Sequence, residues 1–343
     1  DGYELEGGLT MGKRIVLADP RGFCAGVDRA ILTVRTILKS ADTPRADGLP
    51  PVYVRRQIVH NKHVVEDLAA QGAVFVQELA EIPDAAAEAG IPIVFSAHGV
   101  SPAVKAEAAA RGMHVVDATC PLVSKVHREV LRFVKEGYEI IYIGHKGHDE
   151  AVGVVEESPE HVHLIEHASD VDSLDFQPDT KLVLLTQTTL SVDETAGTIT
   201  ALKARFPWLE MPPNSDICYA TSIRRRGQLV AEQADCVVIV GSANSSNSVR
   251  LMEVAQEGLN ARYASKTAVG AAGRAHRVDD ASELDPAWFE DVESVGISSG
   301  ASVPDELVSG VVAALQELGH QDVSTIETIK ENMHFVLPAE LRK

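Results

Sequence analysis

Short apolar runs alternate with helical patterns along most of the chain. An apolar run at 14–18 precedes a segment, 27–39, whose apolar residues recur with helical spacing, and further apolar runs follow at 51–55, 73–76 and 91–95. Strands that alternate with helices are typical of parallel sheets. The pattern therefore predicts an α/β protein built from small parallel sheets.

One order of elements occurs three times, and each time it begins at a cysteine. Helices are expected after Cys24, Cys120 and Cys218, at 27–39, 123–136 and about 222–233. Strands are expected at 51–55, 73–76 and 91–95, at 139–143, 161–165 and 181–185, and at 236–240, 261–263 (less clearly) and 294–297. A period of about a hundred residues is that of a domain. We therefore expect three pseudo-repeated α/β domains, at 24–120, at 121–213 and at 13–23 with 214–343, after a flexible leader at 1–12.

Polar loops follow the first and third strands of every repeat. They lie at 58–61, 96–101, 144–150, 186–191, 241–247 and 298–302, and they are rich in His, Ser, Thr and Asn but poor in Lys and Arg. In open parallel sheets, ligands bind beyond the carboxyl ends of the strands. Three domains with these edges turned inward would bring the loops and the cysteines to one centre.

Composition and charge narrow the function. An apolar content of 45% and a charged content of 24% are typical of a globular protein. The net charge of −19 argues against a nucleic-acid partner, and no apolar run reaches membrane-spanning length. Four cysteines without a disulfide pattern, and no visible signal peptide, favour a reducing cytoplasm. Neither a dinucleotide-binding nor an NTP-binding glycine motif is present.

The three repeated cysteines are candidate metal ligands. Cys24 and Cys120 each lie where an apolar run leads into a helix, and the helix dipole would lower the thiol pKa of Cys24. Three cysteines from separate domains favour an iron–sulfur cluster with one open iron. A zinc site and three unrelated buried thiols remain as alternatives. The fourth, Cys236, lies in an apolar strand and is interpreted as core.

Hydroxyl, amide and imidazole groups at strand ends can bind phosphate without Lys or Arg. We expect this role, with partly protonated histidines, for His60, His98, His148, Ser245, Ser246, Asn247 and Ser302. Glu150 is the candidate proton donor, whereas its neighbour Asp149 is expected to be dispensable. Thr188 and Thr189 are candidates to relay a proton or hold a substrate hydroxyl.

At this point the motifs resemble those of a known family. The matching segments begin with Pro20-Arg21-Gly22-Phe23-Cys24 and continue at 25–27, 59–61, 95–99, 117–123, 144–150, 186–191, 216–221, 245–248 and 300–302. In this order, from about residue 13 to the C-terminus, they are similar to the 4-hydroxy-3-methylbut-2-enyl diphosphate reductase family of the non-mevalonate isoprenoid pathway.

The resemblance implies a trefoil of three α/β domains around a [4Fe–4S] cluster held by Cys24, Cys120 and Cys218. It also implies that the polar residues named above bind the diphosphate, that Thr188 contacts the substrate hydroxyl with Gln187 close by, and that Glu150 delivers protons. Two electrons from a ferredoxin or flavodoxin, with two protons, would then give isopentenyl diphosphate and dimethylallyl diphosphate. The chain departs from the family at 223–226, where Ile-Arg-Arg-Arg replaces a common Asn-Arg-Gln. This departure would affect the orientation of the third helix or a contact to the electron donor.

Two functions of other classes remain open from the residues alone. One is a zinc hydrolase that acts on a phosphorylated metabolite, and the other is an iron–sulfur sensor without enzymatic activity. Visible absorbance that is lost in air would exclude the hydrolase. Turnover with a reduced dye would exclude the sensor.

Overall fold

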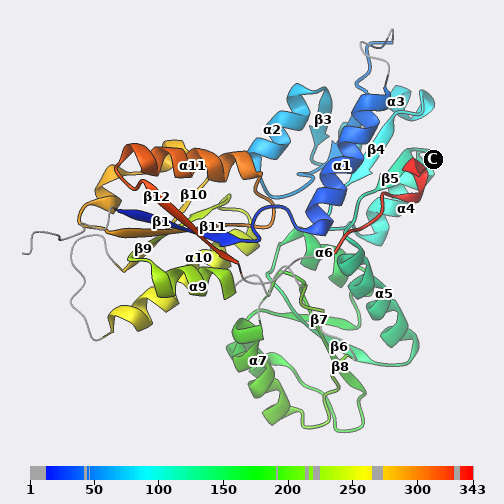
Figure 1. Ribbon diagram of the computed structural model, residues 1–343. Helices are drawn as coiled ribbons and strands as arrows, with labels where there is room; N and C mark the ends of the chain where they lie inside the picture. Colours follow the sequence, from blue (N-terminus) through cyan, green and yellow to red (C-terminus); the bar gives the residue numbers. More distant parts are fainter. Residues whose placement is uncertain are drawn as a thin grey trace, which may run out of the picture. The chain divides into compact units, whose positions relative to one another are not determined.

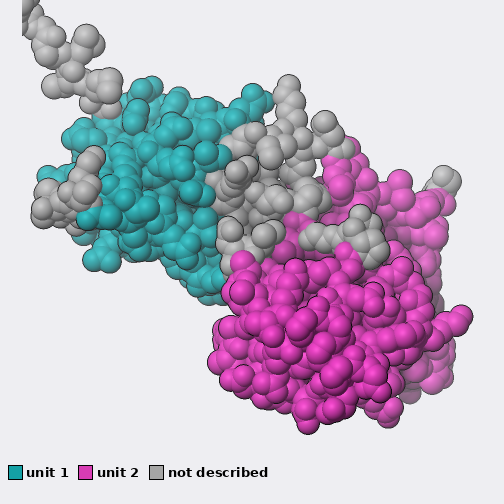
Figure 2. All heavy atoms as spheres, turned by 90° about the horizontal axis from the view of Figure 1, so that it is seen from below, with its two compact units in different colours: residues 1–22, 224–331 teal, residues 23–223, 332–343 magenta. Residues whose placement is uncertain are grey.

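The computed structural model describes residues 13–41, 45, 47–190, 192–212, 216–218, 225–264, 273–327 and 333–342. The chain divides into two compact units (Figure 2), unit 1 with residues 1–22 and 224–331 and unit 2 with residues 23–223 and 332–343. The expected leader at 1–12 lies outside the described residues. Three parallel sheets carry the fold (Figure 1), and each is described within its own unit.

The first sheet of unit 2, sheet B, has four parallel strands in the order β3-β2-β4-β5. Its strands are β2 (Val52–Arg55), β3 (Ala73–Val76), β4 (Pro92–Phe95) and β5 (His114–Asp117). Its helices are α1 (Ala25–Ser40), α2 (Lys62–Ala70), α3 (Asp84–Glu88) and α4 (Pro102–Ala110), with a 3-10 turn at Leu79–Glu81. Side chains alternate across β2, so that Val52 and Val54 pack with α1 and α2 while Tyr53 packs on the opposite face with α3 and α4. Sheet B is therefore covered on both faces.

The second sheet of unit 2, sheet C, has three parallel strands in the order β7-β6-β8. Its strands are β6 (Glu139–Ile143), β7 (Val162–Ile165) and β8 (Leu182–Thr186), and its helices are α5 (Pro121–Lys135), α6 (Asp149–Val155) and α7 (Val192–Arg205), with a 3-10 segment at Ala168–Ser173. Ile140 and Tyr142 pack with α5 and α6, whereas Ile141 and Ile143 pack on the other face with α7. Sheet C is also buried on both sides.

Unit 1 contains sheet A, five parallel strands in the order β10-β9-β11-β1-β12. Its elements are β1 (Arg14–Asp19), α9 (Arg225–Gln233), β9 (Cys236–Val240), α10 (Ser246–Tyr263), β10 (Arg274–Val278), β11 (Ser294–Ser299), α11 (Asp305–Glu317) and β12 (Asp322–Glu327). Three short 3-10 turns complete the described elements of the chain, at Ala281–Glu283, Pro286–Phe289 and, in unit 2, Ala339–Leu341. Strand β1 lies between β11 and β12, so the start of the chain completes a sheet formed by its last third.

The α/β class and the parallel sheets are confirmed, and most expected strands agree within about one or two residues. The strand expected at 261–263 is wrong, because these residues end helix α10, whose buried Leu251, Ala255 and Leu259 recur every four residues. The strand in this place is β10, at Arg274–Val278. The domain boundaries and the arrangement of three domains around one centre stay predictions. Within the described residues, no helix combines the length and apolar character needed to cross a membrane.

Candidate active site

Cys24 and Cys120 lie at the starts of two helices of unit 2. Cys24 is the N-cap of α1 and Cys120 the N-cap of α5, with Pro121 in the first turn as expected. A Cβ added to Gly26 would lie 2.6 Å from the Cys120 Sγ and 4.0 Å from the Cys24 Sγ. Both thiols therefore approach the Gly26 backbone, and only glycine leaves room for the Cys120 sulfur.

Burial dominates the electrostatics of Cys120. It raises the pKa of the Cys120 thiol, and the Glu150 carboxylate raises it further. The backbone N–H groups of Leu122 and Val123 and the Arg29 guanidinium oppose this increase without overcoming it. Burial therefore outweighs the helix start at Cys120, and the lowered pKa expected for Cys24 stays a prediction.

Cys218 is connected to the end of β8. Its backbone N–H donates to the Thr188 carbonyl at 2.9 Å. Two residues earlier, the Asp216 carboxylate accepts from the Thr186 N–H at 3.2 Å and from the Lys125 Nζ at 2.8 Å. The segment 219–224, which includes part of the departure at 223–226, lies outside the described residues, and the side chains of 225 and 226 are not described. Cys24, Cys120 and Cys218 all belong to unit 2, and none of them forms a disulfide in the described part of the chain.

Three histidines at three strand ends of unit 2 lie against one another. His60 follows β2, His98 follows β4, and His148 is the N-cap of α6 after β6. The His60 and His98 rings are stacked with centroids 3.9 Å apart, and the His148 ring lies edge-on to both at 5.3 and 5.8 Å. The structure thus brings together the three imidazoles that the sequence assigned to one site.

Burial controls the charge of this histidine cluster. It lowers the pKa of His60 and His98, and it lowers the pKa of His148 to about 4. The neighbouring imidazoles add to the effect on His98 and His148, whereas the Asp149 carboxylate opposes it at His60 and His148. Without a bound anion the rings are therefore mainly neutral near pH 7, whereas the expectation of partly protonated histidines concerns the diphosphate-bound state and stays a prediction.

Glu150 is buried in the first turn of α6, with 1% of its surface exposed. The Thr188 backbone N–H donates to its Oε1 at 2.7 Å and the Thr188 Oγ1 donates to its Oε2 at 2.9 Å. Burial raises the pKa of Glu150 to about 7, although both Thr188 donors favour the carboxylate, and Asp216 adds to the increase. Glu150 therefore exchanges a proton near neutral pH, as a general acid must.

Gln187 and Thr189 lie beside this pair and bond to each other. The Gln187 Nε2 donates to the Thr189 Oγ1 at 2.6 Å, and the Gln187 Oε1 accepts from the His145 N–H at 2.9 Å. Gln187 is fully buried, so its amide connects the loops that follow β6 and β8. This arrangement positions the loop that carries Thr188.

The four remaining candidates belong to unit 1, at the ends of β9 and β11. Ser245 is the N-cap of α10, and its Oγ accepts from both the N–H and the Oγ of Ser248, at 3.3 and 3.0 Å. The Asn247 Oδ1 accepts from the Ala301 N–H at 2.8 Å, which joins the two loops. The Ser246 Oγ is buried without a protein partner in the described part of unit 1, and Ser302 is buried as well. Unit 1 thus gathers Ser245, Ser246, Asn247 and Ser302 at one sheet edge.

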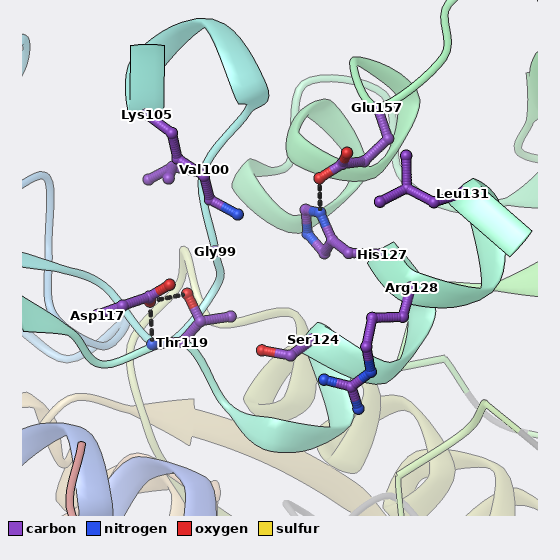
Figure 3. A pocket seen from close by; sticks show the side chains of 10 residues that line it. All are labelled: Gly99, Val100, Lys105, Asp117, Thr119, Ser124, His127, Arg128, Leu131 and Glu157. Carbon is purple, nitrogen blue, oxygen red and sulfur yellow. Dashed lines mark hydrogen bonds and ion pairs between the residues drawn. The ribbon is translucent and has the colours of Figure 1, made fainter. Parts of the chain in front are cut away.

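A pocket of about 190 Å³ lies beside the loop that carries Cys120 (Figure 3). Asp117 accepts from the backbone N–H of Thr119 on one side of it, and on the other side His127 contacts Glu157 through a 2.7 Å hydrogen bond. The sequence analysis missed this buried pair, although His127 follows Val123 and Val126 on the buried face of α5.

Two arginines of unit 2 were also missed. Arg29 is buried one turn past the start of α1, where its guanidinium donates to the Thr119 carbonyl at 3.0 Å and to the Val336 carbonyl at 2.7 Å. Arg56 contacts both Glu78 and Asp149. Arg29 could have been suspected from the sequence, since a charged residue on the apolar face of an expected helix needs a partner.

The LytB protein family matches residues 15–316. The chain belongs to this family. It is 80% identical over 340 residues to the 4-hydroxy-3-methylbut-2-enyl diphosphate reductase of Bifidobacterium longum, an alignment that covers 98% of this chain and 94% of the relative. The reductase of the same name from Nocardia farcinica is 51% identical, with 96% and 91% covered.

The family likeness extends to solved structures. The structure of the E-1-hydroxy-2-methyl-but-2-enyl-4-diphosphate reductase from Plasmodium falciparum superimposes with a TM-score of 0.85 at 35% identity and covers 96% of both chains. The resemblance inferred from the motifs is thereby confirmed. Family membership favours the reductase over the zinc hydrolase and the sensor.

Proposed function

We propose that this protein reduces 4-hydroxy-3-methylbut-2-enyl diphosphate to isopentenyl diphosphate and dimethylallyl diphosphate. Two electrons and two protons enter, the allylic C–O bond breaks, one proton leaves with the oxygen as water, and the other forms a C–H bond. The observation that carries the proposal is that unit 2 holds three cysteines outside any disulfide together with a buried glutamic acid that titrates near neutral pH. Its membership in the LytB family makes the protein an oxidoreductase of the non-mevalonate pathway.

The cysteines fit an iron–sulfur cluster. Cys24, Cys120 and Cys218 would hold it, since none of them is in a disulfide, two cap helices, and Gly26 leaves space against the Cys120 sulfur that a side chain would fill. A [4Fe–4S] cluster there supplies electrons and one open iron for a substrate oxygen. No pair of these cysteines comes from one short loop, as zinc ligands commonly do.

The polar strand ends supply the donors for the diphosphate. His60, His98 and His148 would provide imidazole N–H groups, and the diphosphate-binding role expected for Ser245, Ser246, Asn247 and Ser302 stays a prediction. A bound dianion favours the protonated form of a nearby imidazole, so these rings would take up protons when diphosphate binds. The charge needed to hold the ligand is then created by binding rather than stored in a buried, empty site.

Glu150 would deliver the proton to the leaving oxygen. Its pKa of about 7 keeps a useful fraction protonated at neutral pH, and the two Thr188 bonds fix the carboxyl group. Thr188 would also orient the substrate hydroxyl through its Oγ1, which can exchange a bond to Glu150 for one to substrate. Gln187 would hold this loop in place from behind.

The electrons would come from a separate protein, because the chain contains neither a nicotinamide nor a flavin motif. A ferredoxin or flavodoxin provides single electrons of low potential and fits this need. We place the reaction in the cytoplasm, since reducing conditions protect free thiols.

Anaerobic purification followed by iron and sulfide counts, visible spectroscopy and turnover with a reduced viologen tests the proposal. We expect a brown protein that converts the diphosphate substrate to the two isomeric products, with oxidation of the dye. A colourless zinc protein that releases phosphate, or a brown protein without turnover, would contradict it.

A further inference from the structure

Arg56 joins two parts of unit 2 that carry different sheets. It lies directly after β2 of sheet B, and its Nη1 donates to the Asp149 Oδ1 in the first turn of α6, which belongs to sheet C. Its Nη2 donates to the Glu78 Oε1 at 3.0 Å, and Glu78 also accepts from the Arg55 Nη2 at 2.6 Å. The guanidinium fork is thus shared between two carboxylates, a geometry that Lys cannot reproduce.

The backbone of Arg56 indicates that this position is constrained. Its φ of 56° lies in the left-handed region, which only two described non-glycine residues adopt. Its N–H donates to the Val76 carbonyl at 2.6 Å, beyond the last pair of the β2–β3 ladder. A bulky residue in this conformation is strained, and the surrounding contacts must offset this strain.

Asp149 lies between His148 and Glu150 at the start of α6. His148 is the N-cap of α6, and its Nδ1 accepts from the Glu150 backbone N–H at 3.2 Å. A change at Asp149 therefore moves His148 and Glu150 together. The Asp149 carboxylate also acts electrostatically on both His60 and His148, which places it close to the histidine cluster.

We propose that Arg56 and Asp149 form a latch that positions the first turn of α6, and with it His148 and Glu150, for the reaction. This inference rests on the proposed function, and it revises the expectation that Asp149 is dispensable. Arg56 and Asp149 touch no reacting atom in this scheme, so both are positioning residues.

The surroundings of the latch allow it to be tested without disturbing the core. Arg56 and Asp149 line a pocket of about 270 Å³ together with Glu78 and Ser96, and their side chains are 30% and 18% exposed. A shorter or neutral side chain at either position leaves a space that water can fill, rather than an apolar cavity. The latch should therefore affect geometry more than folding.

The test is a double-mutant cycle of Arg56→Gln, Asp149→Asn and the double variant in the cluster-loaded protein. We expect each single variant to lose roughly ten- to a hundredfold in kcat, the penalty of a slightly misplaced catalytic group. The double variant should lose no more than either single one, because the two residues act as one unit. Arg56→Lys should fall between wild type and Arg56→Gln, since it keeps the charge but not the fork.

Arg35→Gln is the matched control. It breaks an ion pair of the same unit, between Arg35 and Asp67 at 3.0 Å on the exposed surface, and it should keep wild-type kcat. Melting temperature and iron content, measured on every variant, distinguish misfolding of the protein from misplacement of His148 and Glu150. Single variants with wild-type kcat, or a double variant whose loss is the product of the two single losses, would overturn the latch.

Calorimetry with inorganic diphosphate gives a second measurement that needs no turnover. Both single variants should bind diphosphate about tenfold more weakly, since His148 is displaced. If the wild-type protein fails to reduce the substrate, the proposed function fails, and the latch is then judged from calorimetry alone. Unchanged diphosphate affinity in both variants would refute it in that case.

Discussion

The strand ends of unit 2 and the interior of unit 1 contain the same kinds of polar residue in different settings. Cys120 caps a helix beside Gly26, whereas Cys236 is fully buried at the start of β9, where burial raises its pKa to about 12. His98 lies in a cluster of three imidazoles, whereas the fully buried His320 has its Nε2 bonded to the Val292 carbonyl at 3.2 Å and its ring against Phe289.

The two regions differ in how burial affects the protonation of their polar groups. In the interior of unit 1, burial keeps the Cys236 thiol protonated by raising its pKa, and it lowers the pKa of His320, whose Nε2 has a backbone carbonyl as its partner. At the strand ends of unit 2, Glu150 is buried with hydrogen bonds but no cation, so its pKa lies near neutrality. Buried groups such as Glu150 destabilise the fold but are useful for chemistry. Variants of the same residue type in the two regions separate the effect on stability from the effect on activity.

The largest contrast is expected between two cysteines. Cys120→Ser should abolish cluster assembly and activity, because serine is a poor ligand for iron and removes one of three thiolates. Cys236→Ser should keep the iron content and the visible spectrum, with a loss of stability from a hydroxyl placed in an apolar strand. Iron analysis and absorbance after anaerobic reconstitution check this, and equal cluster loss in both variants would mean that the ligands have been misassigned.

Next in size is the effect of removing the proton donor. Glu150→Gln keeps the shape but cannot release a proton, so kcat should fall by about a hundred- to ten-thousandfold while the cluster remains. In the wild type, kcat should decline as the pH rises above about 7, where Glu150 loses its proton. Glu157→Gln is the control at the other end of α6: it breaks the buried contact with His127 and should lower the melting temperature without lowering kcat. A Glu150→Gln enzyme with near wild-type kcat would exclude Glu150 as the donor.

A stability measurement on the same variant tests the cause of the Glu150 pKa. A carboxyl group whose folded pKa lies above its unfolded value stabilises the fold at low pH, and this contribution disappears as the pH rises from about 4.5 to about 7. Above this window the buried carboxylate costs up to about 3 kcal/mol. Glu150→Gln should therefore raise the free energy of unfolding relative to wild type at about pH 8, and less so at about pH 5. Urea denaturation at both values decides the matter, and a variant that is less stable at the higher pH would refute the desolvation argument.

Much of unit 2 could be predicted from the sequence because its signals are local. The strands of sheets B and C are apolar runs, and the carboxyl ends of parallel strands share an edge, so chain order places His60 and His98 at one edge of sheet B. His148 follows β6 of sheet C, and its expected place beside them rested on the repeated order of elements. The edge of sheet A was harder to predict. Strand β10 is largely polar and only half buried, whereas the apolar spacing before it belongs to α10. A strand whose buried face is only weakly apolar gives no alternating hydrophobic pattern in the sequence.

The missed parts of the site depend on contacts between distant residues. Arg56 and Asp149 are 93 positions apart, and nothing near either residue in the sequence marks the pair. The raised pKa of Cys120 could not be predicted from the sequence for a similar reason. A helix start can be recognised from local residues, but the burial that outweighs it arises only when the chain has packed.

The smallest expected effect concerns the histidines. His98→Asn removes one imidazole donor from the cluster and should weaken the binding of inorganic diphosphate by about tenfold or more, the equivalent of one charge-assisted hydrogen bond. His320→Asn should leave this affinity unchanged, because His320 bonds only within the core of unit 1. The three histidines are neutral without a ligand and would take up protons when diphosphate binds. The diphosphate affinity of the wild type should therefore increase as the pH falls from about 8 to about 6, and His98→Asn should flatten this dependence. Calorimetry across this range measures both quantities, and an affinity that is independent of pH in the wild type would show that the imidazoles bind the diphosphate as neutral donors.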